Sequence, residues 1–338
     1  MADIVIIGAG TIGTELRTQL MSAGHAVVAV ATSKRVVFYR QNERIDTLPA
    51  GSIDDAVIKI KANNRQIDAV MIAMTNGNKG LDELRYISSF SDKILVTCAK
   101  AAHAYQYEAI RALAIQIGRS ATVGGGTGLL DILRRRHLNR KSLSIYAVLN
   151  GTLNHIFSEV TRGDSFMRAL KTAENNKYAE PNGENFMDVI NGELMDVAMK
   201  AAIVYNTALS VDGEFITPDW FTITDLSKEA LRQLMSRNAR YRFITTFSSD
   251  NDPDLFYAER PGTVIGKCGR WHISGGFQDV RAESPWYDWL RQVDGVNNGF
   301  MTHDLFGEDT GYSSTGPGAG PVVTAAAMVR DLHDLMAA

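Results

Sequence analysis

Four charged side chains in this sequence suit proton transfer and the binding of a charged small molecule. Asp196 and Lys200 are four residues apart in a segment with a helical pattern, which puts them on one helix face within ion-pair reach. Lys100 follows an apolar, strand-like run, and Glu180 directly precedes a proline. A lysine ammonium can give a proton to an oxygen that becomes negative, and a carboxylate can bind an ammonium group.

Each of these features also has an ordinary structural interpretation. An Asp–Lys pair at this spacing is usually a surface ion pair that contributes about 0.2–0.5 kcal/mol to stability. Glu180 is typical of a loop, and Lys100 of the start of a surface helix. The glycine-rich residues 123–128 are typical of a flexible turn. The elements that carry these residues therefore decide between chemistry and structure.

The N-terminal sequence predicts the element that would hold a cofactor. Residues 4–7 are an apolar, β-branched run, which is typical of a strand buried on both faces of a parallel sheet. Residues 8–13 read GAGTIG, and a helical pattern and a second strand over residues 26–31 follow. The order strand, GxGxxG, helix, strand is the dinucleotide-binding fingerprint.

The residues of this motif have separate expected roles. Gly8 allows the tight turn, Gly10 lets the backbone approach a pyrophosphate, and Gly13 lets the helix pack closely on the strand. Thr11 and Ile12 begin the helix, so their N–H groups and the positive end of the helix dipole would face the phosphates. A bound dinucleotide is therefore expected.

The end of the second strand bears on which dinucleotide binds. An acid about 20 residues past the glycines would bind the ribose 2′-hydroxyl of NAD. Ser33, Lys34 and Arg35 stand there instead, and a hydroxyl with two cations suits a 2′-phosphate. This favours NADP over NAD, and the alternative is that the two cations form only a solvated turn.

Two more strand ends are expected at the same edge of the sheet. Residues 67–74 lead into Thr75 and Asn76, and residues 93–97 lead towards Lys100. Ligands of open α/β sheets bind outside the carboxyl ends of the strands. We therefore expect the nicotinamide ring near Thr75, Asn76 and Lys100.

Six motifs in a fixed order resemble the homoserine dehydrogenase family, through nearly the whole chain. The first is GAGTIG, and residues 96–100, VTCAK, look like the family's V-T-A-N-K segment. The other four look like its N-G-T-x-N turn, its G-Y-x-E loop, its D-x-A-x-K helix and its glycine-rich tail, and they lie at residues 150–154, 177–181, 196–200 and 315–325.

The resemblance implies the NAD(P)-dependent, reversible reduction of L-aspartate 4-semialdehyde to L-homoserine, in threonine and methionine biosynthesis. It implies that Lys200 transfers the proton and that Lys100 shares this role or orients the substrate. Asp196 would hold Lys200 charged and in place. Glu180 would bind the substrate's ammonium group. The implied substrate-binding residues are Glu180, Gly151, Thr152, Tyr178 and Asp188.

The resemblance also implies an α/β fold, with a Rossmann-type parallel sheet domain and a second, α+β domain for substrate binding and dimerisation. The nucleotide domain is expected to be discontinuous, residues 1–145 plus 312–338, because Gly318 and Gly320 would return to the cofactor. Residues 146–311 would form the second domain of a homodimer. The chain ends at Ala338, so the family's optional regulatory domain is expected to be absent.

Some positions depart from the family pattern. Ala99 replaces an asparagine and Val323 a proline. The segment between Glu180 and Asp196 is longer than usual, which makes Asp188 the candidate for a second loop carboxylate.

A further implied ligand is a sodium ion bound by backbone carbonyls. Val123, Gly125 and Thr127 occupy the carbonyl positions of the family's glycine cluster. Ser120 stands where an acidic ligand would be, so one charge that holds the ion is missing.

Composition argues against other classes of protein. The 338 residues carry 35 basic and 38 acidic side chains, a net charge of −3, so there is no basic field for nucleic acid or anionic lipid. No run approaches the ~20 apolar residues that span a bilayer. Two cysteines, Cys98 and Cys268, fit a reducing compartment. We expect a cytoplasmic enzyme with a small-molecule substrate.

Two other functions remain open from the sequence. The first is a paralogous oxidoreductase that acts on a related amino-acid semialdehyde or amino alcohol, which Ala99 and the lengthened loop motivate. The second is a dinucleotide-binding regulatory protein without turnover. His155 follows the NGTLN motif and could approach the substrate, although a structural role is the more ordinary one.

Overall fold

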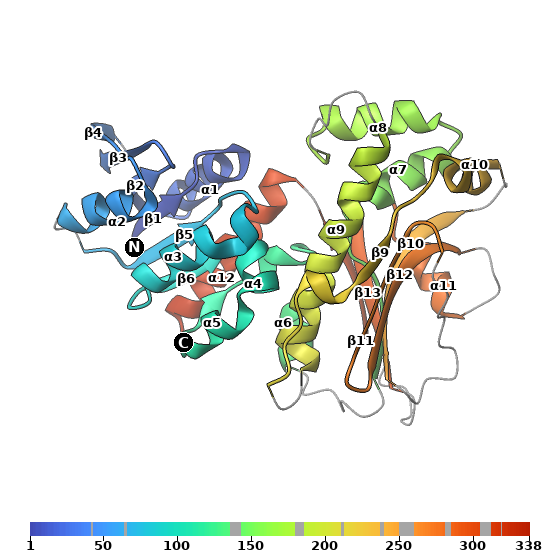
Figure 1. The fold of residues 1–338 in the computed structure, drawn as a ribbon. Coiled ribbons are helices and arrows are strands. Elements are labelled where there is room, and N and C mark those ends of the chain that lie inside the picture. Colours follow the sequence, from blue (N-terminus) through green and yellow to red (C-terminus); the bar gives the residue numbers. More distant parts are fainter. Residues whose placement is uncertain are drawn as a thin grey trace. The chain divides into compact units, whose positions relative to one another are not determined.

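The chain forms two compact units, shown as ribbons in Figure 1. The first comprises Met1–Thr122 and Pro321–Ala338, and the second Val123–Gly320. The structure is a computed structural model that describes residues 1–41, 43–63, 66–135, 143–179, 186–210, 213–236, 240–249, 260–280, 285–304, 312–318 and 320–338. Every helix among these residues is too short or too polar to span a bilayer.

The first unit is built on a seven-stranded sheet with the order β4-β3-β2-β1-β5-β6-β7. The pairs from β2 to β7 are parallel, whereas β3 pairs antiparallel with both β2 and β4. The strands are β1 Asp3–Ile7, β2 Ala26–Ala31, β3 Arg35–Arg40, β4 Glu43–Pro49, β5 Ala69–Ile72, β6 Ile94–Thr97 and β7 Ile117–Gly118. The helices are α1 Thr11–Ser22, α2 Ile53–Ala62, α3 Leu81–Ser89, α4 Ala101–Tyr105, α5 Tyr107–Ala112 and α12 Pro321–Met336, with 3-10 turns at Asn78–Gly80 and Ser120–Thr122.

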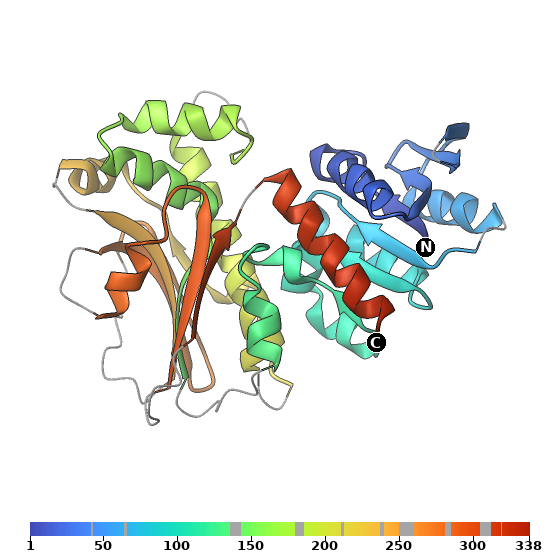
Figure 2. The same ribbon diagram turned by 180° about the vertical axis from the view of Figure 1, so that it is seen from behind.

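Helices cover both faces of this sheet. Ile4 of β1 packs in one apolar cluster with Leu16 of α1 and Met328 of α12. Its neighbour Val5 packs in a second cluster with Ile60 of α2. Successive side chains of a strand point to opposite faces, so an uninterrupted apolar strand requires cover on both. Figure 2 shows α12, the red C-terminal helix, beside α1.

The second unit is built on an antiparallel sheet with the order β14-β13-β8-β10-β12-β11-β9. Its strands are β8 Leu143–Val148, β9 Thr222–Thr224, β10 Tyr241–Ser249, β11 Thr263–Cys268, β12 Trp271–Asp279, β13 Asn297–Asp304 and β14 Tyr312–Pro317. Its helices are α6 Leu129–Arg135, α7 Gly151–Thr161, α8 Phe166–Asn175, α9 Phe186–Val204, α10 Lys228–Ser236 and α11 Pro285–Leu290, with a π turn at Tyr205–Leu209 and a 3-10 turn at Pro218–Trp220.

The alternation of side chains along β10 explains how this second sheet is covered. Phe243 contacts Phe277 of β12, whose ring also contacts Phe157 of α7, with centroids 5.0 and 4.5 Å apart. The next residue, Ile244, points to the other face and packs with Leu290 of α11. The sheet therefore holds α7, which carries the NGTLN motif, through a row of aromatic rings.

The expected α/β fold with a second, α+β domain is confirmed, but the units divide at other residues than expected. Residues 123–145 and 312–320 belong to the second unit rather than the first. The reason is that β14 pairs with β13, and that the N–H of Gly126 donates to the carbonyl of Pro317 (3.2 Å). Both segments are thereby fixed to the antiparallel sheet.

Two local elements also differ from the sequence interpretation. The helix expected to carry Asp196 and Lys200 begins at Phe186, so Asp188 lies in its first turn and not in a loop. An acid in the first turn suits the positive end of the helix dipole. The antiparallel hairpin of β3 and β4 was not expected in a parallel sheet.

Candidate active site

The glycine motif forms the turn between β1 and α1. Gly8 has a φ of +111°, and a Cβ there would lie 2.2 Å from a carbonyl oxygen just after β5. A Cβ on Gly13 would lie 2.1 Å from the carbonyl oxygen of Gly8, so only glycine lets α1 approach this closely. A Cβ on Gly10 would meet no described atom within 4 Å. The open space at Gly10, where Thr11 and Ile12 begin α1, fits a pyrophosphate.

The turn after β2 is fixed by Thr32 and leaves its three polar residues exposed. The Thr32 hydroxyl accepts hydrogen bonds from the N–H groups of Lys34 (3.3 Å) and Arg35 (3.2 Å). The side chains of Ser33, Lys34 and Arg35 are exposed beyond it. Two exposed cations at the carboxyl end of β2 fit a 2′-phosphate.

Asn76 joins the two loops that were expected near the nicotinamide. Its Oδ1 accepts hydrogen bonds from the N–H groups of Lys100 (2.6 Å) and Ala101 (3.2 Å). Asn76 follows β5 and Lys100 follows β6, which are neighbouring parallel strands. Thr75 is exposed beside Asn76, and Lys100 is half-buried. The structure thus brings these residues together at one edge of the sheet.

A buried carboxyl group lies behind this edge, and the sequence reasoning missed it. Glu83 of α3 is 2% exposed and accepts hydrogen bonds from the Thr97 hydroxyl (2.8 Å) and from the N–H of Ala102 (2.9 Å). Burial raises the pKa of Glu83 to about 7, against the two hydrogen bonds, which lower it. In the sequence, Glu83 looks like any acid in the first turn of a helix.

We expect Glu83→Gln to change how stability depends on pH. The carboxyl ionises near pH 4.5 in the unfolded chain and near 7 in the folded one, so wild-type stability falls as the pH rises through this window. Glutamine does not ionise. The difference in the free energy of unfolding, variant minus wild type, should therefore increase by about 3 kcal/mol from about pH 5 to about pH 8. Urea unfolding at both pH values measures this gain, and an equal difference at the two would contradict the burial argument.

Asp196 and Lys200 of α9 form a buried ion pair, not a surface pair. The Lys200 Nζ lies 2.7 Å from Asp196 Oδ2, and the two side chains are only 10% and 14% exposed. The same Nζ donates to the carbonyl oxygen of Leu149 at 2.8 Å. These two oxygens take two of the three N–H bonds of the ammonium. A buried ammonium persists only when it is paired in this way.

Asn150 connects this pair to the NGTLN turn. Its Oδ1 accepts a hydrogen bond from the N–H of Leu153 (2.7 Å) and so caps α7. Its Nδ2 donates to Asp196 Oδ2 (3.0 Å) and to the carboxylate of Glu193. One amide therefore fixes both the start of α7 and the carboxylate that holds Lys200.

The first turn of α7 also fixes Tyr178. Gly151 and Thr152 are buried there, and the Thr152 hydroxyl donates to the carbonyl oxygen of Tyr178 at 2.6 Å. The ring of His155 meets the Tyr178 ring edge-on at 5.3 Å, and burial lowers the pKa of this histidine. Its ring contact and burial fit the structural role for His155.

Two further expected substrate residues are Glu180 and Asp188. Glu180 lies outside the described residues. Asp188 is exposed in the first turn of α9.

Asn298 of β13 is a second residue that the sequence reasoning missed. It is 1% exposed, and its Nδ2 donates at 3.0 Å to the carbonyl oxygen of Leu149, the same oxygen that accepts from Lys200. A Cβ on Gly318 would lie 2.1 Å from Cγ and 2.3 Å from Oδ1 of Asn298. The backbone of Gly318 therefore lies directly against the side-chain amide of Asn298, which donates to the same carbonyl oxygen as Lys200. A Cβ on Gly320, in contrast, would meet nothing within 4 Å.

We expect Gly318→Ala to lower kcat strongly, by about tenfold or more. The added methyl would force Asn298 away, and Leu149 would then lose one donor and shift relative to Lys200. Steady-state kinetics tests this, with Gly51→Ala as the control because a Cβ there meets nothing within 4 Å. Neither Gly318 nor Gly51 has a positive φ, so the two variants differ in the contact of the added methyl and not in left-handed backbone strain. A Gly318→Ala protein with wild-type kcat would contradict the role of this contact.

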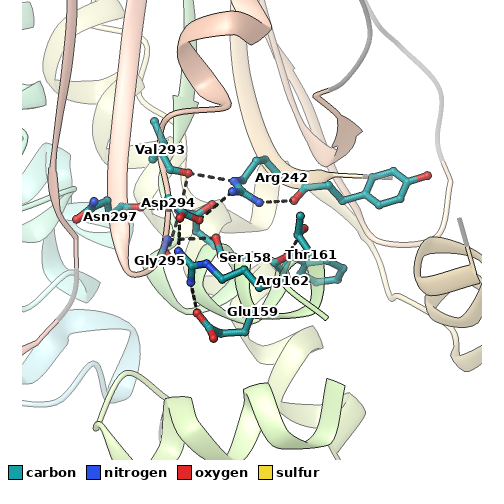
Figure 3. Close-up of polar contacts among 12 residues, drawn as sticks. Ser158, Glu159, Thr161, Arg162, Arg242, Val293, Asp294, Gly295 and Asn297 are labelled. Carbon is teal, nitrogen blue, oxygen red and sulfur yellow. Dashed lines mark hydrogen bonds and ion pairs between the residues drawn. The ribbon is translucent and has the colours of Figure 1, made fainter. Parts of the chain in front are cut away.

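An ion-pair network holds the C-terminal end of α7 (Figure 3). The guanidinium of Arg242, fully buried on β10, donates to the carbonyl oxygen of Val293 (3.0 Å) and to Asp294 Oδ1 (3.1 Å). Arg162, just after α7, pairs with Asp294 and with Glu159. Burial lowers the pKa of Arg242 to about 10, against the charge of Asp294, which raises it. The carboxylate of Asp294 thus joins β10 to α7.

Asn154, the last residue of the NGTLN motif, contacts the loop that follows Asp294. The Asn154 Nδ2 donates to the carbonyl oxygens of Gly295 (3.0 Å) and Asn297 (3.0 Å). The N–H of Gly295 in turn donates to the Ser158 hydroxyl (3.2 Å). The motif is therefore fixed to the loop that leads into β13 and Asn298.

The glycine cluster after the first unit folds back on itself. The carbonyl oxygen of Gly124 accepts from the N–H (2.6 Å) and the hydroxyl (2.7 Å) of Thr127. The carbonyl oxygen of Thr127, one of three expected sodium ligands, accepts from the Ser314 hydroxyl (2.9 Å). Val123 and Gly125, which carry the other two carbonyls, are buried. The sodium site stays a prediction.

Comparison with known proteins decides the family. The family model described as homoserine dehydrogenase matches residues 129–333, more than half of the chain. The chain belongs to the homoserine dehydrogenase family.

Homoserine dehydrogenases of archaea are similar to it over nearly their whole length. The one from Sulfurisphaera tokodaii is 26% identical over 341 residues, which cover 97% of each chain. The one from Methanocaldococcus jannaschii is 24% identical over 361 residues, 98% of this chain and 97% of that one.

Solved homoserine dehydrogenases share the fold. The structure from Thermoplasma acidophilum has a TM-score of 0.73 at 17% identity and covers 100% of this chain and 99% of its own. A hyperthermophilic archaeal enzyme in complex with NADPH has a TM-score of 0.69 at 17% identity, with 99% and 98% covered.

Membership of the homoserine dehydrogenase family confirms the expected class, an NAD(P)-dependent oxidoreductase. The geometry at Gly8, Gly10 and Gly13 fits the dinucleotide that such an enzyme uses. The residues that the sequence reasoning missed, Glu83 and Asn298, share one property: each supports a family motif from a distant part of the chain.

Proposed function

We propose that this protein reduces L-aspartate 4-semialdehyde to L-homoserine with NADPH, reversibly, and that Lys200 supplies the proton. The observation that carries the proposal is the buried ammonium of Lys200, held between Asp196 and the carbonyl of Leu149. Burial of both charges costs free energy, so a pair without a function would be expected at the surface and not buried beside the NGTLN turn.

The chain's own groups would act on the aldehyde oxygen. Bound NADPH supplies the hydride. As the aldehyde carbon is reduced, its oxygen gains negative charge and needs a cation and a proton. Two N–H bonds of Lys200 are taken by Asp196 and Leu149, and we assign the third to this oxygen. Asp196 keeps the amine charged before transfer, and Lys100 acts as a second amine that orients the substrate or shares the proton transfer.

Recognition of the amino-acid part of the substrate is assigned to the loop and the first turn of α7. Glu180 would bind the α-ammonium, because a carboxylate forms a charge-assisted hydrogen bond with it. The backbone and hydroxyl of Gly151 and Thr152 would complete the pocket, with Tyr178 as its wall. The hydrogen bond from Thr152 to Tyr178 supports this grouping. Asp188 is kept as a further candidate for the substrate, although it is exposed on α9.

NADPH is the proposed cofactor rather than NADH. The two exposed cations after β2 support this, as does the archaeal homoserine dehydrogenase of the same fold that was solved with NADPH. We assign Ser33, Lys34 and Arg35 to the 2′-phosphate, Gly10, Thr11 and Ile12 to the pyrophosphate, and Gly318 and Gly320 to a return contact.

We expect Arg35→Ala to raise the KM for NADPH about tenfold, the loss of one charge-assisted contact. The KM for NADH should stay within about twofold, since NADH carries no 2′-phosphate. Initial rates with both cofactors measure this, and Arg40→Ala, also exposed on β3, is the matched control. Equal changes for NADPH and NADH would favour the solvated-turn interpretation.

We also propose a cytoplasmic homodimer. The two cysteines are free and buried, which fits a reducing compartment, and the resemblance to the family supports the dimer. Light scattering during gel filtration tests the subunit count. A mass near 37 kDa, that of one chain, would contradict the dimer.

The substrate is tested by comparing two aldehydes. NADPH oxidation should be fast with L-aspartate 4-semialdehyde and at least ~100-fold slower with its homologue one carbon longer, because a pocket with two fixed charged contacts rejects the wrong spacing. The reverse preference would favour a paralogous oxidoreductase. Binding of NADPH without turnover of either aldehyde would favour a regulatory protein.

A further inference from the structure

Glu83 has no part in the proposed reaction, yet it supports the loop that carries Lys100. We infer that Glu83 is a positioning residue: through Thr97 and Ala102 it fixes the backbone of residues 97–102 and thereby the place of the Lys100 amine. The inference rests on the proposed function for its effect on catalysis, but not for its effect on the loop.

Side chains accept hydrogen bonds from the backbone N–H groups of four consecutive residues in this loop. The N–H of Ala99 donates to the Thr97 hydroxyl (3.0 Å), those of Lys100 and Ala101 donate to Asn76, and that of Ala102 donates to Glu83. Thr97 is oriented in its turn by Glu83. Of these three side chains, Asn76 is exposed, whereas Thr97 and Glu83 are buried. Because Glu83 accepts from both the Thr97 hydroxyl and the N–H of Ala102, it is the fixed support of the loop.

Donors and acceptors at Glu83 balance only when it is a carboxylate. Three donors meet there: the N–H groups of Ala99 and Ala102 and the hydroxyl of Thr97. Three acceptors receive them: the Thr97 oxygen and the two carboxylate oxygens. Glutamine would turn one acceptor into a donor that faces the Thr97 hydroxyl, whose proton would then lack a partner. Glu83→Gln therefore disturbs the loop without emptying the space.

The start of α3 is pressed against the same loop. Gly80 has a φ of +78°, and a Cβ there would lie 2.3 Å from the backbone nitrogen of Ala102. The two residues before it, Asn78 and Lys79, have φ values of +50° and +45°, a left-handed conformation that costs free energy in residues other than glycine. Such a strained backbone conformation persists only where the packing of the surrounding residues enforces it. The contact between α3 and residues 101–102 thus sets the position of Glu83.

The stability cost of Glu83 also points to a role in function. No residue that the structure describes forms an ion pair with Glu83, and its burial raises its pKa to about 7. Replacing this carboxyl by glutamine should raise stability near pH 8. A residue that lowers stability in this way is expected where activity requires it. Two neighbouring titratable groups lie on the loop. Burial and the charge of Glu83 raise the pKa of Cys98, whereas Lys100 lowers it. Burial lowers the pKa of His103.

The test compares wild type with Glu83→Gln, Thr97→Val and the control Glu108→Gln, an exposed acid on α5. At about pH 8 we expect Glu83→Gln to lower kcat by about tenfold or more, with the Kd of NADPH within about twofold and stability equal or higher. Amide hydrogen exchange should become faster in residues 97–105 and stay unchanged in α1. Thr97→Val should show the same direction, and Glu108→Gln no change.

Three results would overturn the inference. One is a Glu83→Gln protein with wild-type kcat and wild-type exchange in residues 97–105. Another is a fall in kcat together with a fall in stability and in NADPH affinity, which a merely structural residue would give. The third is unchanged exchange in both variants. A wild-type protein that does not reduce L-aspartate 4-semialdehyde would refute the proposed function alone, and the exchange measurement would still decide whether Glu83 fixes the loop.

Discussion

Replacing Lys200 by methionine should lower kcat by about a thousandfold, within the range that general acid catalysis supplies. Methionine has a similar length but no proton to give, and the oxygen of the substrate would lose both the cation and the proton. NADPH binding, assigned to residues other than Lys200, should stay within about twofold. Steady-state kinetics and fluorescence titration of NADPH measure the two effects separately.

Two companion variants separate proton transfer from charge. Lys200→Arg keeps a cation beside Asp196, but a guanidinium does not release its proton in proteins, so kcat should still fall by at least ~100-fold. Lys171→Met removes an exposed lysine of α8 and should have no effect. A Lys200→Met protein with more than about a tenth of wild-type kcat would rule out Lys200 as the proton donor.

Replacing Asp294 by alanine should lower the free energy of unfolding by about 3–5 kcal/mol. The reason is Arg242, whose side chain is 0% exposed and whose charge would be left without a counterion. Burial already lowers the pKa of Arg242 to about 10 with Asp294 in place. Urea unfolding at about pH 7, followed by the fluorescence of the second unit's tryptophans, measures the loss.

The matched control for this prediction is Asp288→Ala. Asp288 pairs with Arg291, but its side chain is 69% exposed, so the pair is worth only about 0–1 kcal/mol. Equal losses for the two variants would show that burial of Arg242 does not determine the strength of its network. Stability should also fall in acid, because the Asp294 pKa lies below its usual value in the folded state and protonation removes the pair.

The sequence predicted the parts of the site that depend on local patterns. Gly8, Gly10 and Gly13 have the geometry of the fingerprint because each role follows from the conformation of one turn. The capping of α7 by Asn150 likewise follows from an Asn-Gly turn before a helix. The contact between Asp196 and Lys200 follows from helix periodicity alone.

What the sequence did not predict depends on contacts between distant segments. The ion pair of Asp196 and Lys200 is buried because α9 packs where Leu149 and Asn150 can reach it, 46 to 51 residues away in the chain. Asn298 comes to the same carbonyl only through the pairing of β13 with β8. The division into units differs from the expected one for the same reason, since the tail before α12 pairs with β13.

The central claim is that a hydride passes to C4 of L-aspartate 4-semialdehyde while Lys200 protonates its oxygen. The most direct test incubates the purified protein with this aldehyde and NADPH that carries deuterium at both C4 positions of the nicotinamide. Mass spectrometry should find L-homoserine with one deuterium on C4, formed in equal amount to the NADPH consumed, and almost none with Lys200→Met. Unlabelled homoserine, or no homoserine from the wild-type protein, would contradict the claim.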